Sequence, residues 1–358
     1  MFSLSPLMWA EMAFGTLIIG YLLFSTKQLE MKEDKEHLGR VPYLDFLKGV
    51  AIIAVVAIHA TALIPRMFSL NNVLWFAMPF FVMASGYLLS IRHPVKLDIK
   101  HHLQRVLFRI IIVYAFFLIV IRLVEGRGFN LSLFGKDLLF GMDDGSLYFI
   151  PLMIQLYLVF PLLLPLRKWF TNRWVLTASF LISFLFWQHH AIIQQHVWNN
   201  DLWFLIFFGR YFFYFTFGIY LSDLKIGELR WHHLSRLIIY YVLGTILFSL
   251  TLGYFHQPFL YPAIALLLFL IVHNSNHKKT PWLDHAWVNT LGMHSLIIYL
   301  VHGRILFGIM PLFLERNPLP PWINYIFIIS LTLALSYAIS LGFMLVYKRC
   351  LALCRLKL

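Results

Sequence analysis

The feature that most constrains the fold of this chain is a series of apolar segments, each about 20 residues long, separated by short polar stretches. A helix of this length spans the hydrocarbon core of a bilayer. Charged residues make up only 13% of the 358 residues, whereas a soluble protein has about a quarter. No polar stretch exceeds about 25 residues, which is far below the size of a domain. We therefore predict an all-α, multi-pass membrane protein without a separate soluble domain.

The apolar segments predict a polytopic membrane helical bundle of eleven transmembrane helices. The predicted spans are 5–24, 43–64, 71–91, 103–122, 147–166, 173–189, 203–222, 234–254, 258–274, 286–311 and 321–347. We interpret 1–25 as an extra N-terminal transmembrane helix, because no basic region and no A-x-A-like site marks it as a cleaved signal. We interpret 26–42 as a cytoplasmic linker, 43–347 as a ten-helix core and 348–358 as a basic tail. The two cysteines, Cys350 and Cys354, lie in this tail, and we assign them no role.

The distribution of Lys and Arg predicts how the chain is oriented. With eleven spans, alternate loops hold nineteen of these residues on one side of the membrane and five on the other. The positive-inside rule places the richer side in the cytoplasm, with the N-terminus outside and the C-terminus inside. Because the loops explain most of the net charge of +13, we expect no nucleic acid partner.

The segment YLDFLKGVAIIAVVAIHA, residues 43–60, places titratable groups in a predicted span. At about 100° per residue, Lys48 and His59 lie three turns apart on one face, ~16 Å along the helix axis, and Asp45 lies close to that face. Charged groups are costly in hydrocarbon, so this face should line a buried or water-filled path. A single buried histidine is more often a packed core residue than a catalyst. Its alignment with Lys48 leaves both interpretations of His59 open.

The span 286–311 contains a candidate partner for His59 in the sequence LGMHSLIIYLVHGRIL. Ser295, Tyr299 and His302 share one helical face, and His302 lies in the same half of the membrane as His59. No carboxylate or cysteine accompanies the two histidines at ligand spacing, so we predict no metal site. Histidine titrates near neutral pH, and proton transfer therefore suits the pair better.

Further cations fall inside predicted spans. In HHLQRVLFRIIIVY, Arg105 and Arg109 lie one turn apart at the cytoplasmic end, at about the depth of Lys48. Guanidinium groups at this depth suit phosphates that enter from the cytosol, although a long side chain at a helix end can also extend to the interface. Arg210 and Arg304 are also intramembrane cations, which mark functional sites by default.

Five segments, in this order, resemble the acyltransferase-3 family of integral-membrane acyltransferases. They are LDFLKG followed by His59, MPFFVMASGYLL, RVLFRIIIVY, LYFIPLMIQLYLVFPLL and LGMHSLIIYLVH, and the resemblance covers residues 40–347. The first has a basic residue, ten residues and a histidine, as in that family's first core helix. The lysine at position 48 and the motif MPFF resemble the pattern of the branch of fucose acetylases and exopolysaccharide O-acyltransferases. Where some members have carboxylates in VEEQFYL, this chain has Met153 to Tyr157 without them.

The resemblance implies a function and a set of roles. Family members move an acyl group, usually acetyl, from cytosolic acyl-CoA to a hydroxyl of a cell-envelope glycan or lipid-linked sugar, in the bacterial cytoplasmic membrane. His59 would be the base or a transient acyl carrier, with His302 as the second catalytic residue. The expected cofactor-binding residues are Lys48, Ser85, Tyr87, Arg105 and Arg109. The expected acceptor-binding residues are Asp45, Arg210, Ser295 and Tyr299.

Two other functions remain open from the residues alone. A transporter or flippase for a glycan or lipid-linked sugar would also have His and Arg side chains along its path. A structural or sensory subunit of a glycan-export complex would leave the alignment of Lys48 with His59 unexplained. Binding of CoA would distinguish an acyltransferase from a transporter or flippase.

Overall fold

The computed structural model describes residues 42–93, 97–126, 128, 130–141, 147–166, 169, 173–188, 208–223, 285–316 and 319–353. Every secondary-structure element in these ranges is helical. The α-helices are α2 (Pro42–Ala60), α3 (Asn71–Leu74), α4 (Ala77–Arg92), α5 (Ile99–Val106), α6 (Ile112–Val124), α7 (Leu131–Phe140), α8 (Phe149–Leu163), α10 (Arg173–Gln188), α13 (Phe212–Asp223), α16 (Ala286–Met293), α17 (Ser295–Gly308), α18 (Met310–Arg316) and α19 (Pro321–Leu353). The other turns are η1 (Pro65–Leu70), the π-helical turn η2 (Leu107–Ile111), η3 (Leu164–Leu166) and η4 (Phe208–Arg210).

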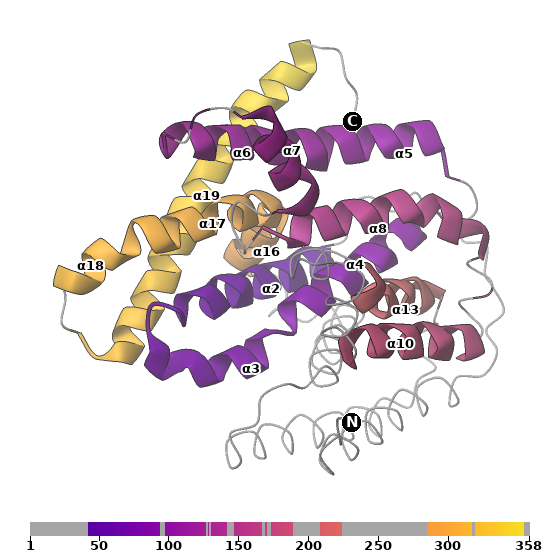
Figure 1. Cartoon of the computed structure of the whole chain (residues 1–358), viewed down its shortest axis with the longest axis horizontal. Helices are drawn as coiled ribbons and strands as arrows, with labels where there is room; N and C mark the ends of the chain where they lie inside the picture. The colour runs from indigo at the N-terminus through magenta and orange to yellow at the C-terminus, as the bar shows by residue number, and fades with distance from the viewer. Residues whose placement is uncertain are drawn as a thin grey trace.

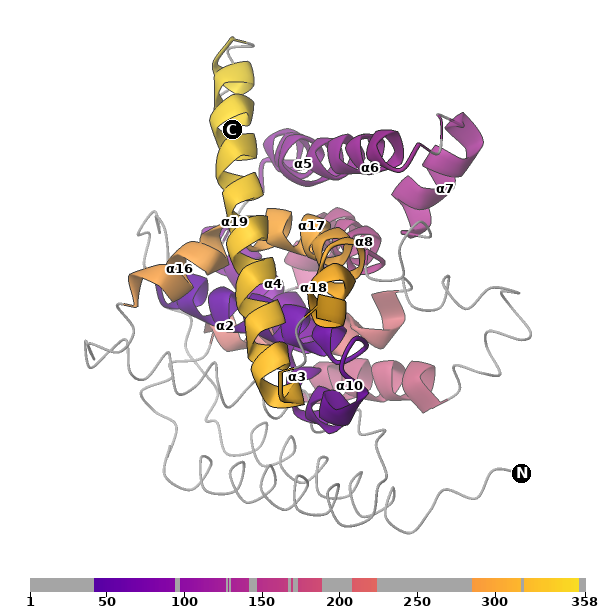
Figure 2. The same cartoon turned by 90° about the vertical axis from the view of Figure 1, so that its left-hand side faces the viewer.

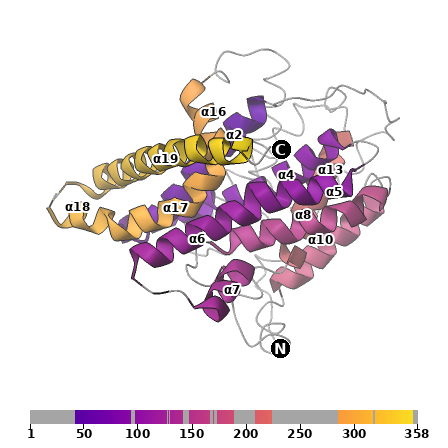
Figure 3. The same cartoon turned by 90° about the horizontal axis from the view of Figure 1, so that it is seen from above.

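The helices are stacked in layers. One long rod, formed by α5, η2 and α6, lies along one face, with α8 beneath it and α2 and α4 further in (Figures 1 and 2). Helices α10 and α13 follow on the opposite side, and α13 packs against α4. Helix α19 crosses the end of the stack and packs on α17 and α2, as the view from above also shows (Figure 3). Helix α2 is therefore surrounded by other helices.

Several of these helices are long and apolar enough to cross a membrane. Within the described residues four qualify by length and composition, namely Tyr43–Ala60, Ile99–Val124, Phe149–Leu166 and Pro321–Leu353. The pair α16 and α17 would make a fifth. Three shorter apolar helices are Ala77–Arg92, Trp174–Ser183 and Phe212–Ser222. These findings support a helical membrane protein. The predicted spans 5–24, 234–254 and 258–274, and the N-terminal unit 1–25 with nearly all of the linker, lie outside the described residues.

The structure differs from the sequence prediction in three described segments. The span predicted as 286–311 is broken at His294, where α16 and α17 meet at 84°. The predicted span 71–91 contains a full helix only from Ala77. The predicted loop after residue 122 contains α7, which begins where Asn130 accepts a hydrogen bond from the Leu133 amide at 3.1 Å. It ends at Gly141, which has a left-handed φ of 65°.

Glycines allow two pairs of helices to pack at backbone distance. A methyl group on Gly49 of α2 would clash with the Val288 carbonyl of α16, and one on Gly292 of α16 would clash with the Asp45 carbonyl of α2. Close packing through small residues is a common way for membrane helices to associate. These contacts fix α16 against the part of α2 that holds Lys48. The pair α4 and α13 is joined in the same way through Gly86 and Gly218.

Candidate active site

Helix α2 presents its titratable face to the protein interior. Along that face Asp45 is 6% exposed, Ile52 is fully buried and Val55 is 1% exposed. Lys48 and His59 are partly buried. The prediction that this face avoids lipid is therefore supported by the packing of the helices around α2.

A cavity of about 410 Å³ opens beside this face and is lined by α2, α4, α5, η2, α8, α16 and α17. Along α4 its wall runs from Phe81 to Arg92, which is ~16 Å of helix. Along α8 it runs from Phe149 to Tyr157. Such a volume lies within the range of small-molecule sites. The cavity thus extends along both α4 and α8.

Positive charge gathers at one end of the cavity. Five lining side chains from the end of α4, from α5 and from η2 form what we name the basic cluster: Arg92, His93, His102, Arg105 and Arg109. No carboxylate is among the described residues that line the cavity. The buried Nε of Arg105 has no hydrogen-bond partner in the described part of the protein, and an unsatisfied buried donor is costly. A bound anion would balance the positive charge of these side chains and could accept hydrogen bonds from them.

Lys48 contributes a further cation to the wall, but its charge is balanced. Its Nζ lies 2.6 Å from a carboxylate oxygen of Asp45, one turn away on α2. Asp45 itself does not line the cavity. The ion pair orients the Lys48 side chain, which lines the cavity together with Gly292 and Ser295. Asp45 therefore contacts the cavity wall through Lys48, and its role in acceptor binding stays a prediction.

Aromatic rings line the other end of the cavity. Phe81, Phe149 and Tyr299 form what we name the aromatic end, with ring centroids 6.0 Å apart for the first two and 5.7 Å apart for the last two. The Tyr299 ring also lies 5.5 Å from the ring of His302. Ring contacts therefore connect the cavity to the histidines, although neither His59 nor His302 lines it.

The two predicted histidines form a hydrogen-bonded pair. Nε2 of His302 lies 3.0 Å from Nδ1 of His59, and the ring centroids are 4.9 Å apart. Nδ1 of His302 lies 2.6 Å from the Tyr299 carbonyl, and Nδ1 of His59 lies 3.0 Å from the Val55 carbonyl. We name His59 and His302 the histidine pair. It joins α2 to α17.

The carbonyl partners assign the tautomers of the histidine pair. A carbonyl only accepts, so Nδ1 of His302 is protonated and its Nε2 is an acceptor. Nδ1–H of His59 then donates to that Nε2 and to the Val55 carbonyl. Nε2 of His59 is therefore the basic nitrogen of a neutral ring. His302 is fully buried whereas His59 is partly exposed, so His59 is the member that a reactant can approach.

The remaining predicted site residues divide into two groups. Ser85, Ser295 and Tyr299 line the cavity with Lys48 and the two arginines, and the Tyr157 hydroxyl donates to Ser85 at 3.4 Å.

Tyr87 and Arg210 lie elsewhere. Tyr87 bonds the Tyr43 hydroxyl at 2.9 Å, because two residues along a helix turn its side chain about 200° away from that of Ser85. Arg210 is buried among the hydroxyl groups of Tyr148, Tyr211 and Tyr214, and it does not line the cavity.

Sequence reasoning missed three members of the basic cluster. The positive-inside count treats Arg92 as one of the nineteen loop charges that set topology, and the sequence patterns give His93 and His102 no role. Their signal was a dense basic stretch on both sides of one short loop, RHPVKLDIKHH. Arg304, also predicted as an intramembrane cation, pairs with Glu125 at 2.5 Å.

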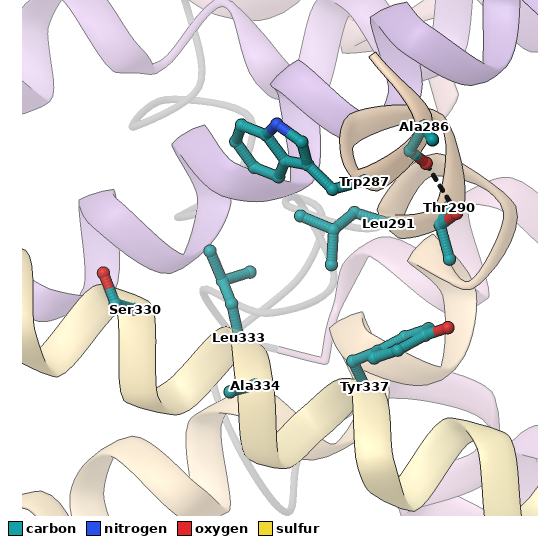
Figure 4. Close-up of a pocket in the computed structure, with 8 residues that line it drawn as sticks. All are labelled: Ala286, Trp287, Thr290, Leu291, Ser330, Leu333, Ala334 and Tyr337. Atoms are coloured by element: carbon teal, nitrogen blue, oxygen red, sulfur yellow. Dashed lines mark hydrogen bonds between the residues drawn. The ribbon is translucent and has the colours of Figure 1, made fainter.

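A second cavity, of about 460 Å³, lies between α16 and α19 and has a different character. Trp287 and Leu333 face it, and Thr290 donates to the Ala286 carbonyl at 2.6 Å rather than into the cavity (Figure 4). No charged side chain is among its described lining residues. Nor does the described part of the chain contain a group of three or more side chains suited to hold a metal ion. The basic cavity and the histidine pair therefore make the better candidate site.

These features define a helical membrane protein with a basic cavity next to a hydrogen-bonded pair of histidines. A family model described as an acyltransferase domain, that of the acyltransferase-3 family, matches residues 41–341. The chain belongs to this family and is therefore a membrane acyltransferase. Searches of the curated proteins and of the solved structures find no match.

Proposed function

We propose that the protein transfers an acyl group, most simply acetyl, from cytosolic acyl-CoA to a hydroxyl of a cell-envelope glycan or lipid-linked sugar. One observation carries the proposal: a single cavity connects the basic cluster to an aromatic end that contacts the histidine pair. An anionic donor with a long neutral arm fits such a cavity. The protein would lie in the bacterial cytoplasmic membrane, with the basic cluster toward the cytoplasm and the C-terminus inside.

The dimensions of the cavity support acyl-CoA as the donor. Its phosphates would bind Arg105 and Arg109, since guanidinium groups bind phosphate oxygens with paired hydrogen bonds. The pantetheine arm would then follow the ~16 Å of wall along α4. Its amides have a hydroxyl neighbour in Ser85 and a cation in Lys48. The thioester would reach the aromatic end, where the Tyr299 ring contacts the ring of His302.

The histidine pair supports general base catalysis. As the acceptor hydroxyl oxygen bonds to the thioester carbonyl carbon, Nε2 of His59 takes the hydroxyl proton. Nδ1–H of His59 donates to Nε2 of His302, which stabilises the imidazolium that forms. The tetrahedral intermediate then breaks its C–S bond, and the imidazolium returns the proton to the departing thiolate. The products are the ester and CoA thiol. In an acyl-carrier variant, Nε2 of His59 would attack the thioester carbonyl carbon and displace the CoA thiolate, and the acceptor hydroxyl would then take the acyl group and release the imidazole.

The acceptor would approach from the side opposite the donor. Ser295 and Tyr299 lie where the cavity approaches the histidine pair, so they remain the best placed of the predicted acceptor residues. Arg210 would contribute only if the acceptor extends to its tyrosine-lined surroundings.

A transporter or flippase for the same sugars is the alternative function, because it could also use polar groups inside a helical bundle. Two measurements on the purified full-length protein separate them. We expect saturable CoA binding, and acetyl-CoA turnover that His59→Ala abolishes. A protein that neither binds CoA nor consumes acetyl-CoA, but moves a lipid-linked sugar across vesicles, would contradict the proposal. Mass spectrometry of envelope glycans from cells with and without the gene would identify the acceptor.

A further inference from the structure

The basic cluster contains two histidines as well as three arginines. The donor site proposed above uses arginines of this cluster but neither histidine. His93 follows the last residue of α4, and His102 lies in α5. Both line the cavity, and their rings meet edge to face with centroids 6.3 Å apart. They form a second pair of imidazoles, at the end of the cavity opposite the histidine pair.

His102 is fixed by its surroundings. It is 3% exposed, and its Nε2 lies 2.9 Å from the Tyr157 carbonyl of α8. Because a carbonyl only accepts, Nε2–H of His102 donates this hydrogen bond. The ring also packs against Phe160, with centroids 5.9 Å apart. His102 therefore has a defined orientation, and it presents a fixed edge to His93.

His93 is surrounded by positive charge. Burial, and after it the positive charges of neighbouring side chains, lowers the pKa of His93 to about 4. The titratable groups that face His93 are Arg92 from α4 and His101, His102 and Arg105 from α5. Tyr157 of α8 lies behind His102 and contacts its ring. Asp98, the nearest carboxylate in the chain among the described residues, is exposed and caps α5 by accepting from the His101 amide. His93 is therefore neutral at physiological pH while the cavity is empty of anions.

We propose that His93, oriented by His102, recognises a phosphate monoester in its dianionic form and takes up one proton when that dianion binds. The inference rests on the proposed function, in which the monoester is the 3′-phosphate of CoA. The same chemistry could come from the headgroup of an anionic lipid at the membrane surface. In both cases a dianion reverses the local field, so that the imidazolium becomes the favoured form beside the arginines.

The sign of the pH dependence follows from this linkage. The pKa of His93 is about 4 in the free protein and higher in the complex. Between those two values binding takes up a proton, and affinity rises as the pH falls. Above the pKa of the complex His93 is neutral in both states and affinity no longer depends on it. Full uptake of one proton corresponds to a tenfold gain in affinity for each pH unit of acidification. Uptake of half a proton therefore gives about threefold.

The test compares wild-type protein with His93→Gln in neutral phosphatidylcholine nanodiscs, with CoA, dephospho-CoA and 3′,5′-ADP as probes. The ratio of the two CoA affinities cancels the titration of the ligand itself and the shared contribution of the arginines. We expect this ratio to be close to 1 at about pH 8 and to rise several-fold by about pH 6. Dephospho-CoA, which lacks the monoester, should give a ratio close to 1 throughout. His285→Gln is the matched control, since His285 is exposed and does not line the cavity, and this variant should follow the wild type.

A calorimetric measurement on the wild type makes the test independent of the variant. The heat of 3′,5′-ADP binding in two buffers of different ionisation enthalpy gives the number of protons exchanged. A site of arginines alone favours the dianion, so it releases protons from the ligand, whose second pKa is about 6. We expect net uptake near about pH 7. If the pH-dependent difference between the wild type and His93→Gln appears with nanodiscs that contain phosphatidic acid, and not with CoA, the phosphate monoester comes from a lipid headgroup.

Two outcomes overturn the inference and can be told apart. If CoA binds but protons are released or not exchanged, and the affinity ratio stays flat, His93 is not the recognition group while the donor assignment stands. If the wild type binds none of the three probes and shows no response to phosphatidic acid, the donor assignment fails together with this inference.

Discussion

The basic cluster and the histidine pair differ in how much each depends on one side chain. The cluster combines three arginines with two histidines, from α4, α5 and η2, at one end of a cavity of about 410 Å³. The histidine pair has two rings whose protons are assigned by single contacts to the Tyr299 and Val55 carbonyls. Charge adds over many groups, so the loss of one cation leaves most of the field in place. The protonation of each ring in the histidine pair depends on one or two contacts that no other residue replaces. Substitutions in the histidine pair should therefore lower activity far more.

The largest expected effect is that of His59→Ala. Removing the basic Nε2 should lower acyl transfer ~10²–10⁴-fold, which is the usual contribution of a general base. CoA affinity should stay within about twofold of the wild type, because His59 does not line the cavity. The measurement pairs CoA affinity with acetyl-CoA turnover in membrane-inserted protein. His59→Gln should behave alike, since it keeps hydrogen-bonding groups but no base, and wild-type transfer by either variant would end the proposed mechanism.

The next largest effect is expected from His302→Phe, which keeps a ring but removes the acceptor of the His59 Nδ1–H. We expect kcat to fall about 10–100-fold, equivalent to about 1–3 kcal/mol, with unchanged CoA affinity. The pH at half-maximal kcat should also shift, which a merely structural role would not produce. His294→Gln is the control, because His294 bonds Ser340 at 2.8 Å and does not line the cavity. Equal losses in both variants would mean that general damage to the bend between α16 and α17 is the cause.

Sequence periodicity predicted some of this arrangement well. A period of 3.6 residues was enough to place Asp45, Lys48 and His59 on one face of α2, and burial of that face follows from the cost of charge in hydrocarbon. The same geometry explains why Ser85 lines the cavity and Tyr87 does not.

The contact between His59 and His302 was not accessible in the same way. It joins residues 243 positions apart and depends on how α2 and α17 cross. That crossing is set by backbone contacts at Gly49 and Gly292 and by the bend at His294, and single-helix patterns do not contain them. The histidines of the basic cluster were missed for another reason. The positive-inside rule already accounted for the charge around them, so it left no residual signal.

A smaller effect is expected from Arg105→Gln, because the other cations of the basic cluster remain. CoA affinity should fall about tenfold, near the value of one charged hydrogen bond, while turnover at saturating acetyl-CoA changes little. Arg66→Gln is the control, since Arg66 is exposed in η1 and lies outside the cavity lining. An effect on kcat as large as that of His59→Ala would show that the two ends of the cavity are not functionally distinct.

The smallest functional effect is expected from Gly292→Ala, which tests whether helix packing links the two ends. The new methyl group meets the Asp45 carbonyl, so α16 must move away from α2 at the turn that holds Lys48. Overpacking of this kind costs about 1–3 kcal/mol of stability, and we expect CoA affinity to fall a few-fold. Gly342→Ala is the matched control, because nothing lies within 4 Å of its added methyl group in α19. That variant should gain about 0.5–1 kcal/mol from the better helix former and leave CoA affinity unchanged. Thermal unfolding and CoA titration of both variants provide the comparison. If Gly292→Ala is as stable as Gly342→Ala and binds CoA normally, the backbone contact between α2 and α16 does not position Lys48.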